Sequence, residues 1–183
     1  DNINTTNHGQ NAAPFLSNNN LYFTSSRVDS VVEKKKKVAK YQNKLYTSNN
    51  NVAEKVNFPA PKDKHVGAFT FSPDGKTVYY SQWDLTDMEA KSSTIYKSTI
   101  GDDGNWKEGE KVVGDINVDG FTSKQPMLTL DGKYLMYSSN KPGGQGGFDI
   151  WYANVEGDKI GASKNFGSTI NTANNEITPF RSE

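Results

Sequence analysis

The sequence Phe-Ser-Pro-Asp-Gly-Lys-Thr-Val-Tyr-Tyr-Ser at residues 71–81 predicts the end of one strand, a tight turn and a second strand. The Asp-Gly pair at 74–75 tolerates the positive φ that tight hairpins need to match the twist of their strands. Val78, Tyr79 and Tyr80 are of the β-branched and aromatic types that suit a pleated, half-buried surface. This segment therefore predicts a β-hairpin.

The same pattern recurs along the chain at a nearly constant spacing. The motif that precedes the turn occurs in one phase at 13–17, 68–72, 125–129 and 178–182. The steps between the second residues of successive copies are 55, 57 and 53 residues. A fixed period of this size is typical of repeat architectures, in which each repeat is one structural unit that packs on its neighbours.

Each unit continues with further short strands and no amphipathic helix. The expected second strands are 21–25, 78–81 and 135–139, the third strands 44–48, 94–98 and 149–153, and the fourth strands 53–58, 107–113 and 160–166. Four short antiparallel strands per unit predict an all-β fold, a β-propeller fragment of about three four-stranded antiparallel blades. The expected blades are 12–66, 67–123 and 124–177, with the start of a further blade at 178–183.

A second repeated motif marks the blade junctions. Ile3-Asn4-Thr5, Ile116-Asn117-Val118 and Ile170-Asn171-Thr172 occupy the same phase of the repeat, so both ends of the chain are expected at blade junctions. Propellers usually close with four to eight blades, so three blades would leave two open faces. We therefore expect a proteolytic or partly ordered fragment of a longer protein, or an assembly in which another copy completes the ring.

Charge and composition exclude several classes of function. The 183 residues carry 21 Lys and Arg against 21 Asp and Glu, which removes the electrostatic basis for binding nucleic acid or anionic lipid. The absence of cysteine excludes disulfides, thiolate metal sites and a cysteine nucleophile. The apolar runs are too short to cross a bilayer, so direct membrane insertion by this chain is not expected.

Two segments carry a resemblance to a known family of repeats. The pattern at 71–81 and the glycine-rich pattern at 138–151, which ends in Gly-Gly-Phe-Asp-Ile-Trp, resemble the WD-like propeller repeat of TolB-type periplasmic proteins. With the Asn-Phe-Gly and Ile-Asn-Thr that follow, the second pattern is most similar to the variant in large OmpA-family envelope proteins of Bacteroidetes. Such proteins combine tetratricopeptide repeats, this propeller and a peptidoglycan-binding domain, and one belongs to the type IX secretion machinery.

The resemblance implies a non-enzymatic protein-binding or scaffolding module in the periplasm, associated with the outer membrane. The expected partners are other envelope proteins, with peptidoglycan bound through a separate domain of the parent protein. Two alternatives stay open: the propeller of a serine peptidase of the prolyl-oligopeptidase type, or a surface glycan-binding protein. The latter would use Trp83, Trp106 or Trp151 as stacking platforms, although Trp151 fits a core position better.

Candidate partner-binding residues lie in two loops between strands. The first blade departs from the repeat with a long charged loop at 27–40, where a cationic run is a candidate docking site. The second loop is glycine-rich, and Asp149 is expected to bind its backbone amides and hold it. The candidates are Lys34, Lys35, Lys36, Lys37, Gly143, Gly144, Gly146 and Gly147.

No catalytic residue, metal ligand or cofactor is expected. The chain contains no Gly-x-Ser-x-Gly segment for a nucleophilic serine. His8 and His65 stand near different blade junctions without a second histidine at metal-binding spacing. The acidic turn at 102–105 lacks the alternating ligands and terminal glutamate of a calcium loop.

Overall fold

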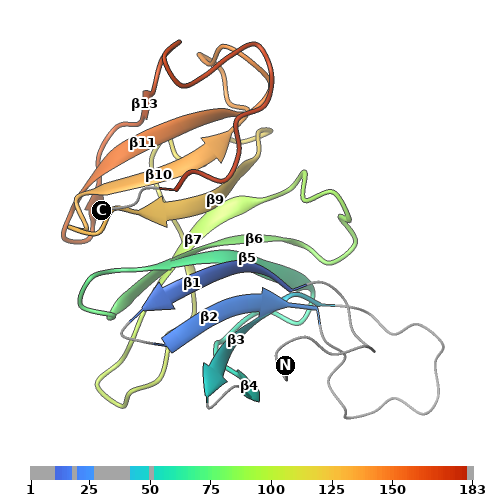
Figure 1. The fold of residues 1–183 in the computed structure, drawn as a ribbon, viewed down its shortest axis with the longest axis vertical. Helices are drawn as coiled ribbons and strands as arrows, with labels where there is room; N and C mark the ends of the chain where they lie inside the picture. Colours follow the sequence, from blue (N-terminus) through green and yellow to red (C-terminus); the bar gives the residue numbers. More distant parts are fainter. Residues whose placement is uncertain (1–10, 18–19, 27–41, 50–51, 181–183) are drawn as a thin grey trace.

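A computed structural model describes residues 11–17, 20–26, 42–49 and 52–180. Every regular element in these ranges is a β-strand, which confirms the all-β prediction. These residues contain no helix of the length and apolar character needed to cross a membrane. Three antiparallel sheets are stacked one on the next in chain order, with the blue N-terminal sheet and the orange C-terminal sheet on opposite sides of the green one (Figure 1).

We name the three sheets blades 1, 2 and 3, and in each the strands follow one another as a meander. Blade 1 contains β1 (Asn11–Ser17), β2 (Asn20–Ser25), β3 (Lys44–Asn49) and β4 (Val52–Lys55). Blade 2 contains β5 (Lys64–Phe71), β6 (Thr77–Asp84), β7 (Thr94–Thr99) and β8 (Glu110–Lys111). Blade 3 contains β9 (Ser123–Leu128), β10 (Tyr134–Ser139), β11 (Asp149–Glu156), β12 (Lys159–Ile160) and β13 (Lys164–Asn165).

The innermost strands begin earlier than the expected unit boundaries. The boundary between 66 and 67 falls inside β5, and the boundary between 123 and 124 falls inside β9. The strand continues through the motif because a bulge, with a register shift between Gly67 and Phe69, absorbs one extra residue without ending the pairing of β5 with β6.

The turn after β5 is a tight hairpin, as the sequence predicts. Asp74 Oδ1 accepts hydrogen bonds from Ser72 Oγ (2.5 Å) and from the Lys76 amide (3.0 Å). The turn after β9 repeats this arrangement, because Asp131 Oδ1 accepts from Thr129 Oγ1 (2.7 Å) and from the Lys133 amide (3.1 Å). A carboxylate that binds the backbone two residues on favours the turn conformation in both hairpins.

Aromatic and aliphatic side chains are buried between neighbouring blades. The cluster between blades 1 and 2 comprises Leu45, Val66, Phe69, Phe71, Val78 and Tyr80. The cluster between blades 2 and 3 comprises Tyr79, Ile95, Val112, Ile116, Leu128, Leu135, Tyr137, Trp151 and Ala153. Since adjacent residues such as Tyr79 and Tyr80 belong to different clusters, the sheet buries both of its faces, one against each neighbour.

The repeated Ile-Asn motif connects the end of a blade to its third strand. Asn117 is buried; its Oδ1 accepts from the Ile95 amide (2.8 Å), and its Nδ2 donates to the carbonyls of Ile95 (2.8 Å) and Val112 (2.9 Å). Asn171 makes the same pair of bonds to Ile150 in blade 3, at 2.8 and 3.0 Å. Ile3-Asn4-Thr5, the first copy of the motif, lies outside the described residues.

His65 links blade 1 to blade 2. Its Nδ1 accepts a hydrogen bond from the Asn43 amide (3.1 Å), so the ring proton is on Nε2, which lies 3.3 Å from the Leu85 carbonyl. The imidazole stacks on Trp83, with 5.2 Å between ring centroids. Burial lowers the pKa of His65 below its ordinary value of 6.5.

We expect the free energy of unfolding to decrease as the pH falls from 7.5 to 5.5. The unfolded chain binds a proton at His65 near pH 6.5, whereas the folded chain does so only at lower pH, so stability is lost below about pH 6.5. One proton contributes at most about 1.4 kcal/mol per pH unit. Urea unfolding at both pH values tests this, and His65→Gln should lose that part of the pH dependence. An unchanged dependence in His65→Gln contradicts the assignment.

Candidate functional site: the axial cavity

The innermost strand of every blade carries the same backbone irregularity. Ala13, Ala68, Gln125 and Thr178, the first residues of the four copies of the motif, have φ angles of 49°, 49°, 56° and 57°. None of them is glycine, and the left-handed conformation costs an L-residue roughly 1–2 kcal/mol. Four equivalent residues held in this conformation mark a constraint imposed by the repeat, and such residues concentrate at functional sites.

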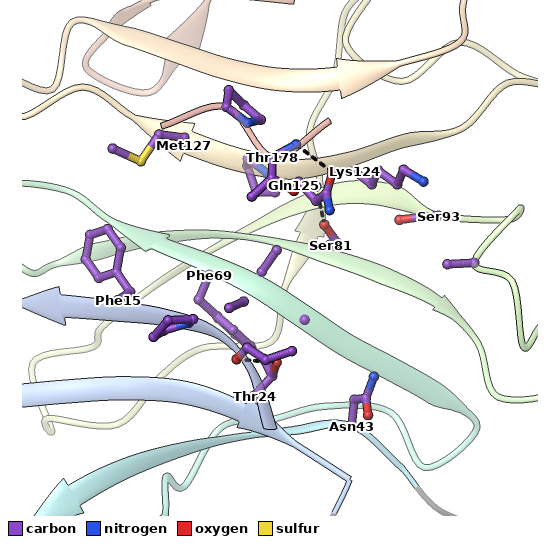
Figure 2. A pocket seen from close by; sticks show the side chains of 18 of the residues that line it. Phe15, Thr24, Asn43, Phe69, Ser81, Ser93, Lys124, Gln125, Met127 and Thr178 are labelled. Carbon is purple, nitrogen blue, oxygen red and sulfur yellow. Dashed lines mark hydrogen bonds between the residues drawn. The ribbon is translucent and has the colours of Figure 1, made fainter. Parts of the chain in front are cut away.

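These residues line one cavity of about 490 Å³. Its walls come from the innermost strands of all three blades, from parts of β2, β6 and neighbouring loops, and from residues 178–180. Phe15, Phe69 and Met127 represent the three blades (Figure 2). A propeller places the innermost strands of its blades around a central channel. The cavity therefore lies on the axis that the three blades share, and we call it the axial cavity.

Hydrogen bonds from the repeated motif to neighbouring parts of the fold fix the shape of the axial cavity. The Gln125 amide donates to Ser81 Oγ (2.8 Å), which joins blade 3 to blade 2. The Thr178 amide donates to Gln125 Oε1 (3.0 Å), so the last copy of the motif is tied to the copy before it (Figure 2). Because backbone amides of the motif are held by side chains of its neighbours, the cavity wall is preorganised.

Lys124 is the one lysine among the described residues that line the axial cavity. Its Nζ lies 4.0 Å from the centroid of the Phe148 ring, at a distance that suits a cation–π contact. Burial lowers the pKa of Lys124 below its ordinary value. A mostly apolar wall with a small number of polar groups is the usual composition of a ligand site.

The glycine-rich loop lies between β10 and β11 and is exposed. Asp149 holds it as expected, because its carboxylate accepts from the amides of Gln145 and Gly146, the latter at 3.1 Å. The Gly147 amide donates to the Asn174 carbonyl (2.9 Å). Three amides of the loop are therefore already bound within the chain. The proposed partner-binding role of Gly143, Gly144, Gly146 and Gly147 stays a prediction.

We expect Gly146→Ala to destabilise the fold by about 1–3 kcal/mol. A Cβ atom at Gly146 would overlap the carbonyl oxygens of Thr172 and Asn174, which belong to the backbone and cannot rotate away. Gly161→Ala is the matched control, since its Cβ would meet nothing closer than 3.6 Å. Chemical denaturation of both variants measures the difference, and equal stabilities would show that the loop is not packed as described.

The remaining sequence candidates are dispersed. Lys34, Lys35, Lys36, Lys37 and His8 lie outside the described residues. Trp151 is buried between blades 2 and 3, and Trp106 packs against Phe58 and Phe71 with ring centroids 6.2 and 5.9 Å apart. Trp83 alone among the three tryptophans lines the axial cavity. The structure thus does not bring the three tryptophans together on one platform.

Two four-stranded sheets and one five-stranded sheet, stacked around a shared cavity, define the chain as blades of a β-propeller. Among solved structures it is similar to TolB from Acinetobacter baumannii, with a TM-score of 0.50 and 16% identity over 84% of this chain and 31% of TolB. It is also similar to puromycin hydrolase, with a TM-score of 0.54 and 14% identity over 85% of this chain and 22% of the hydrolase. No family model and no curated protein matches the sequence.

The chain spans less than a third of the length of each of these two proteins. Because the sequence identities are only 16% and 14%, the similarity shows the fold alone. TolB and a puromycin hydrolase both contain this fold, so the fold alone does not distinguish the functions expected from the sequence. The chemistry of the axial cavity has to distinguish them.

Proposed function

We propose that the chain is a non-enzymatic protein-binding and scaffolding module of a periplasmic envelope protein associated with the outer membrane, and that the axial cavity receives a segment of the partner. The observation that carries the proposal is the cavity itself, which all three blades and the fourth copy of the motif build together. Its volume of about 490 Å³ lies within the range of sites that bury a ligand of several residues or a drug-sized molecule.

The rigidity of the cavity wall supports a binding role. The wall consists of paired strands and interblade hydrogen bonds, so a partner segment would lose little affinity to ordering of the site. Apolar groups such as Trp83 and Phe180 supply contact area, and Gln125 supplies a polar group. An extended peptide with alternating apolar and polar side chains matches this composition.

The envelope location rests on the sequence resemblance to OmpA-family proteins of Bacteroidetes, including the type IX secretion machinery, and on the fold shared with TolB. In this proposal the propeller contacts other envelope proteins. Peptidoglycan is bound by a separate domain of the parent protein.

Photo-crosslinking in the native host tests the proposal. A benzophenone amino acid at Phe180, on the cavity wall and 79% exposed, should yield an adduct with an envelope protein. The same amino acid at Phe121, which is also exposed but does not line the cavity, is the control and should not yield that adduct. Absence of an adduct from Phe180, or the same adducts from both positions, contradicts the proposal.

A further inference from the structure

We propose that the axial cavity binds a carboxylate group of a peptide, held between Lys124 Nζ and Ser93 Oγ. This inference rests on the proposed function, since it names the chemistry by which the cavity recognises a partner segment. The two side chains come from different blades and are distant in sequence, so only the fold brings them to one place.

A backbone hydrogen bond places the two residues next to each other. The Ser123 amide at the start of β9 donates to the Ser93 carbonyl (2.9 Å), just before β7. Lys124 is the next residue of β9, so it begins beside Ser93 at the junction of blades 2 and 3. Both residues line the axial cavity, and Figure 2 shows them at the same end of it.

Lys124 supplies a cation that has no anionic partner. Its ammonium lies over the Phe148 ring, and no ion pair joins it to a carboxylate of the described residues. A half-buried ammonium has lost part of its hydration, and an aromatic face replaces only part of that interaction. A ligand carboxylate would therefore bind here with little competing attraction.

Ser93 supplies a hydrogen-bond donor that is fully buried and unused. Its Oγ has no hydrogen-bond partner, and it is the only buried side-chain polar atom in this condition among the described residues. Figure 2 shows the hydroxyl oxygen directed into the cavity. Buried polar groups in proteins are almost always paired, so this unpaired hydroxyl on the cavity wall is free to donate to a bound carboxylate.

The rest of the cavity determines what is attached to the carboxylate. Pro126 and Met127 follow Lys124 on β9 and line the cavity, as does Phe69 on β5. A carboxylate beside an apolar side chain fits this environment, as at the C-terminus of a peptide ending in leucine or at an acidic residue next to leucine. The apolar surroundings lower the local dielectric constant and strengthen the contact between the carboxylate and the ammonium.

Isothermal titration with a matched pair of probes tests the inference. N-acetyl-leucine carries the carboxylate, and N-acetyl-leucinamide differs only in lacking it. We expect at least tenfold weaker binding of the amide. N-acetyl-aspartyl-leucinamide, which carries its carboxylate on a side chain, identifies the source: binding as tight as that of N-acetyl-leucine favours an internal acidic residue, and weaker binding favours a C-terminus.

Variants of the two residues complete the test. Lys124→Met should weaken binding of N-acetyl-leucine at least tenfold, Lys124→Arg should retain the preference for the acid, and Lys159→Met, at an exposed lysine far from the cavity wall, should change nothing. Ser93→Ala should weaken binding several-fold. The same variant should raise the unfolding temperature of the free protein, because it removes an unpaired buried hydroxyl.

Equal binding of the acid and the amide, no binding of either, or unchanged binding in Lys124→Met would overturn the inference. These outcomes are separate from failure of the proposed function. If the Phe180 crosslink to an envelope protein persists while the probes show no preference for the acid, only the carboxylate site is wrong. If the acid binds through Lys124 but no crosslink forms, the site is a carboxylate site and the partner role is wrong.

Discussion

Replacement of Ile116 by alanine is expected to destabilise the fold by about 2–5 kcal/mol, whereas the same replacement at Ile170 is expected to cost less than about 1 kcal/mol. The two residues occupy the same position in successive repeats, each before the asparagine of the Ile-Asn motif. Ile116 is 0% exposed because blade 3 covers it, and Ile170 is 49% exposed. The comparison measures how much free energy of unfolding the next blade contributes by covering one position of the repeat.

The neighbouring positions agree with this reading. The Val112 amide donates to the Ile95 carbonyl in blade 2, and the Phe166 amide donates to the Ile150 carbonyl in blade 3. Although the two bonds are equivalent, Val112 is 2% exposed and Phe166 is 36% exposed. Urea unfolding of the two isoleucine variants at one protein concentration gives the difference in free energy. If Ile170→Ala costs as much as Ile116→Ala, the covering of one blade by the next is not the source of the stability.

Asn117→Ala is expected to cost about 3 kcal/mol or more. The side chain bonds to two backbone groups of Ile95 and one of Val112, all buried. Alanine removes this partner from the Ile95 amide and the Val112 carbonyl, whereas the Ile95 carbonyl keeps its hydrogen bond from the Val112 amide. Each unsatisfied buried group costs roughly 1–3 kcal/mol, and the cavity left by the side chain adds to this. This prediction isolates the polar part of the blade junction from its apolar part.

Hydrogen exchange gives a second readout for the asparagine. The Ile95 amide should lose its protection in Asn117→Ala, because its acceptor is the Asn117 side chain. Asn154→Ala is the control, at an exposed position in the middle of β11, and should change stability by no more than about 0.5 kcal/mol. Retained protection at Ile95 would show that another acceptor replaces Asn117.

The repeat made the architecture predictable from sequence. Asp74 and Asp131 define two hairpins by local chemistry alone, and the constant spacing of the motif implies that each unit packs on the next. The Ile-Asn motif was visible as a repeated pattern, but its role was not. Asn117 bonds to Ile95 across 22 residues, and no local rule connects two such positions.

The candidate site was much less predictable. The left-handed conformation of Ala13 and Gln125 has no signature in residue type, since neither is a glycine or an asparagine. Nothing in the sequence distinguishes Lys124 and Ser93 from other lysines and serines. They become distinctive only in the fold, where burial removes water from the Lys124 ammonium and leaves Ser93 Oγ without a hydrogen-bond partner. The sequence predicted that the glycines around Gly146 form a partner-binding loop. The structure shows that close backbone packing also requires glycine at Gly146.

The central claim is that the blades stabilise one another in series around a common axis, and double-mutant cycles test it most directly. Ile95→Val and Leu135→Val lie in the cluster between blades 2 and 3, whereas Leu45→Val lies in the cluster between blades 1 and 2. The account predicts a coupling energy of at least about 0.5 kcal/mol for Ile95 with Leu135, and additivity within about 0.3 kcal/mol for Leu45 with Leu135. Additive effects in the first pair together with coupling in the second would contradict it.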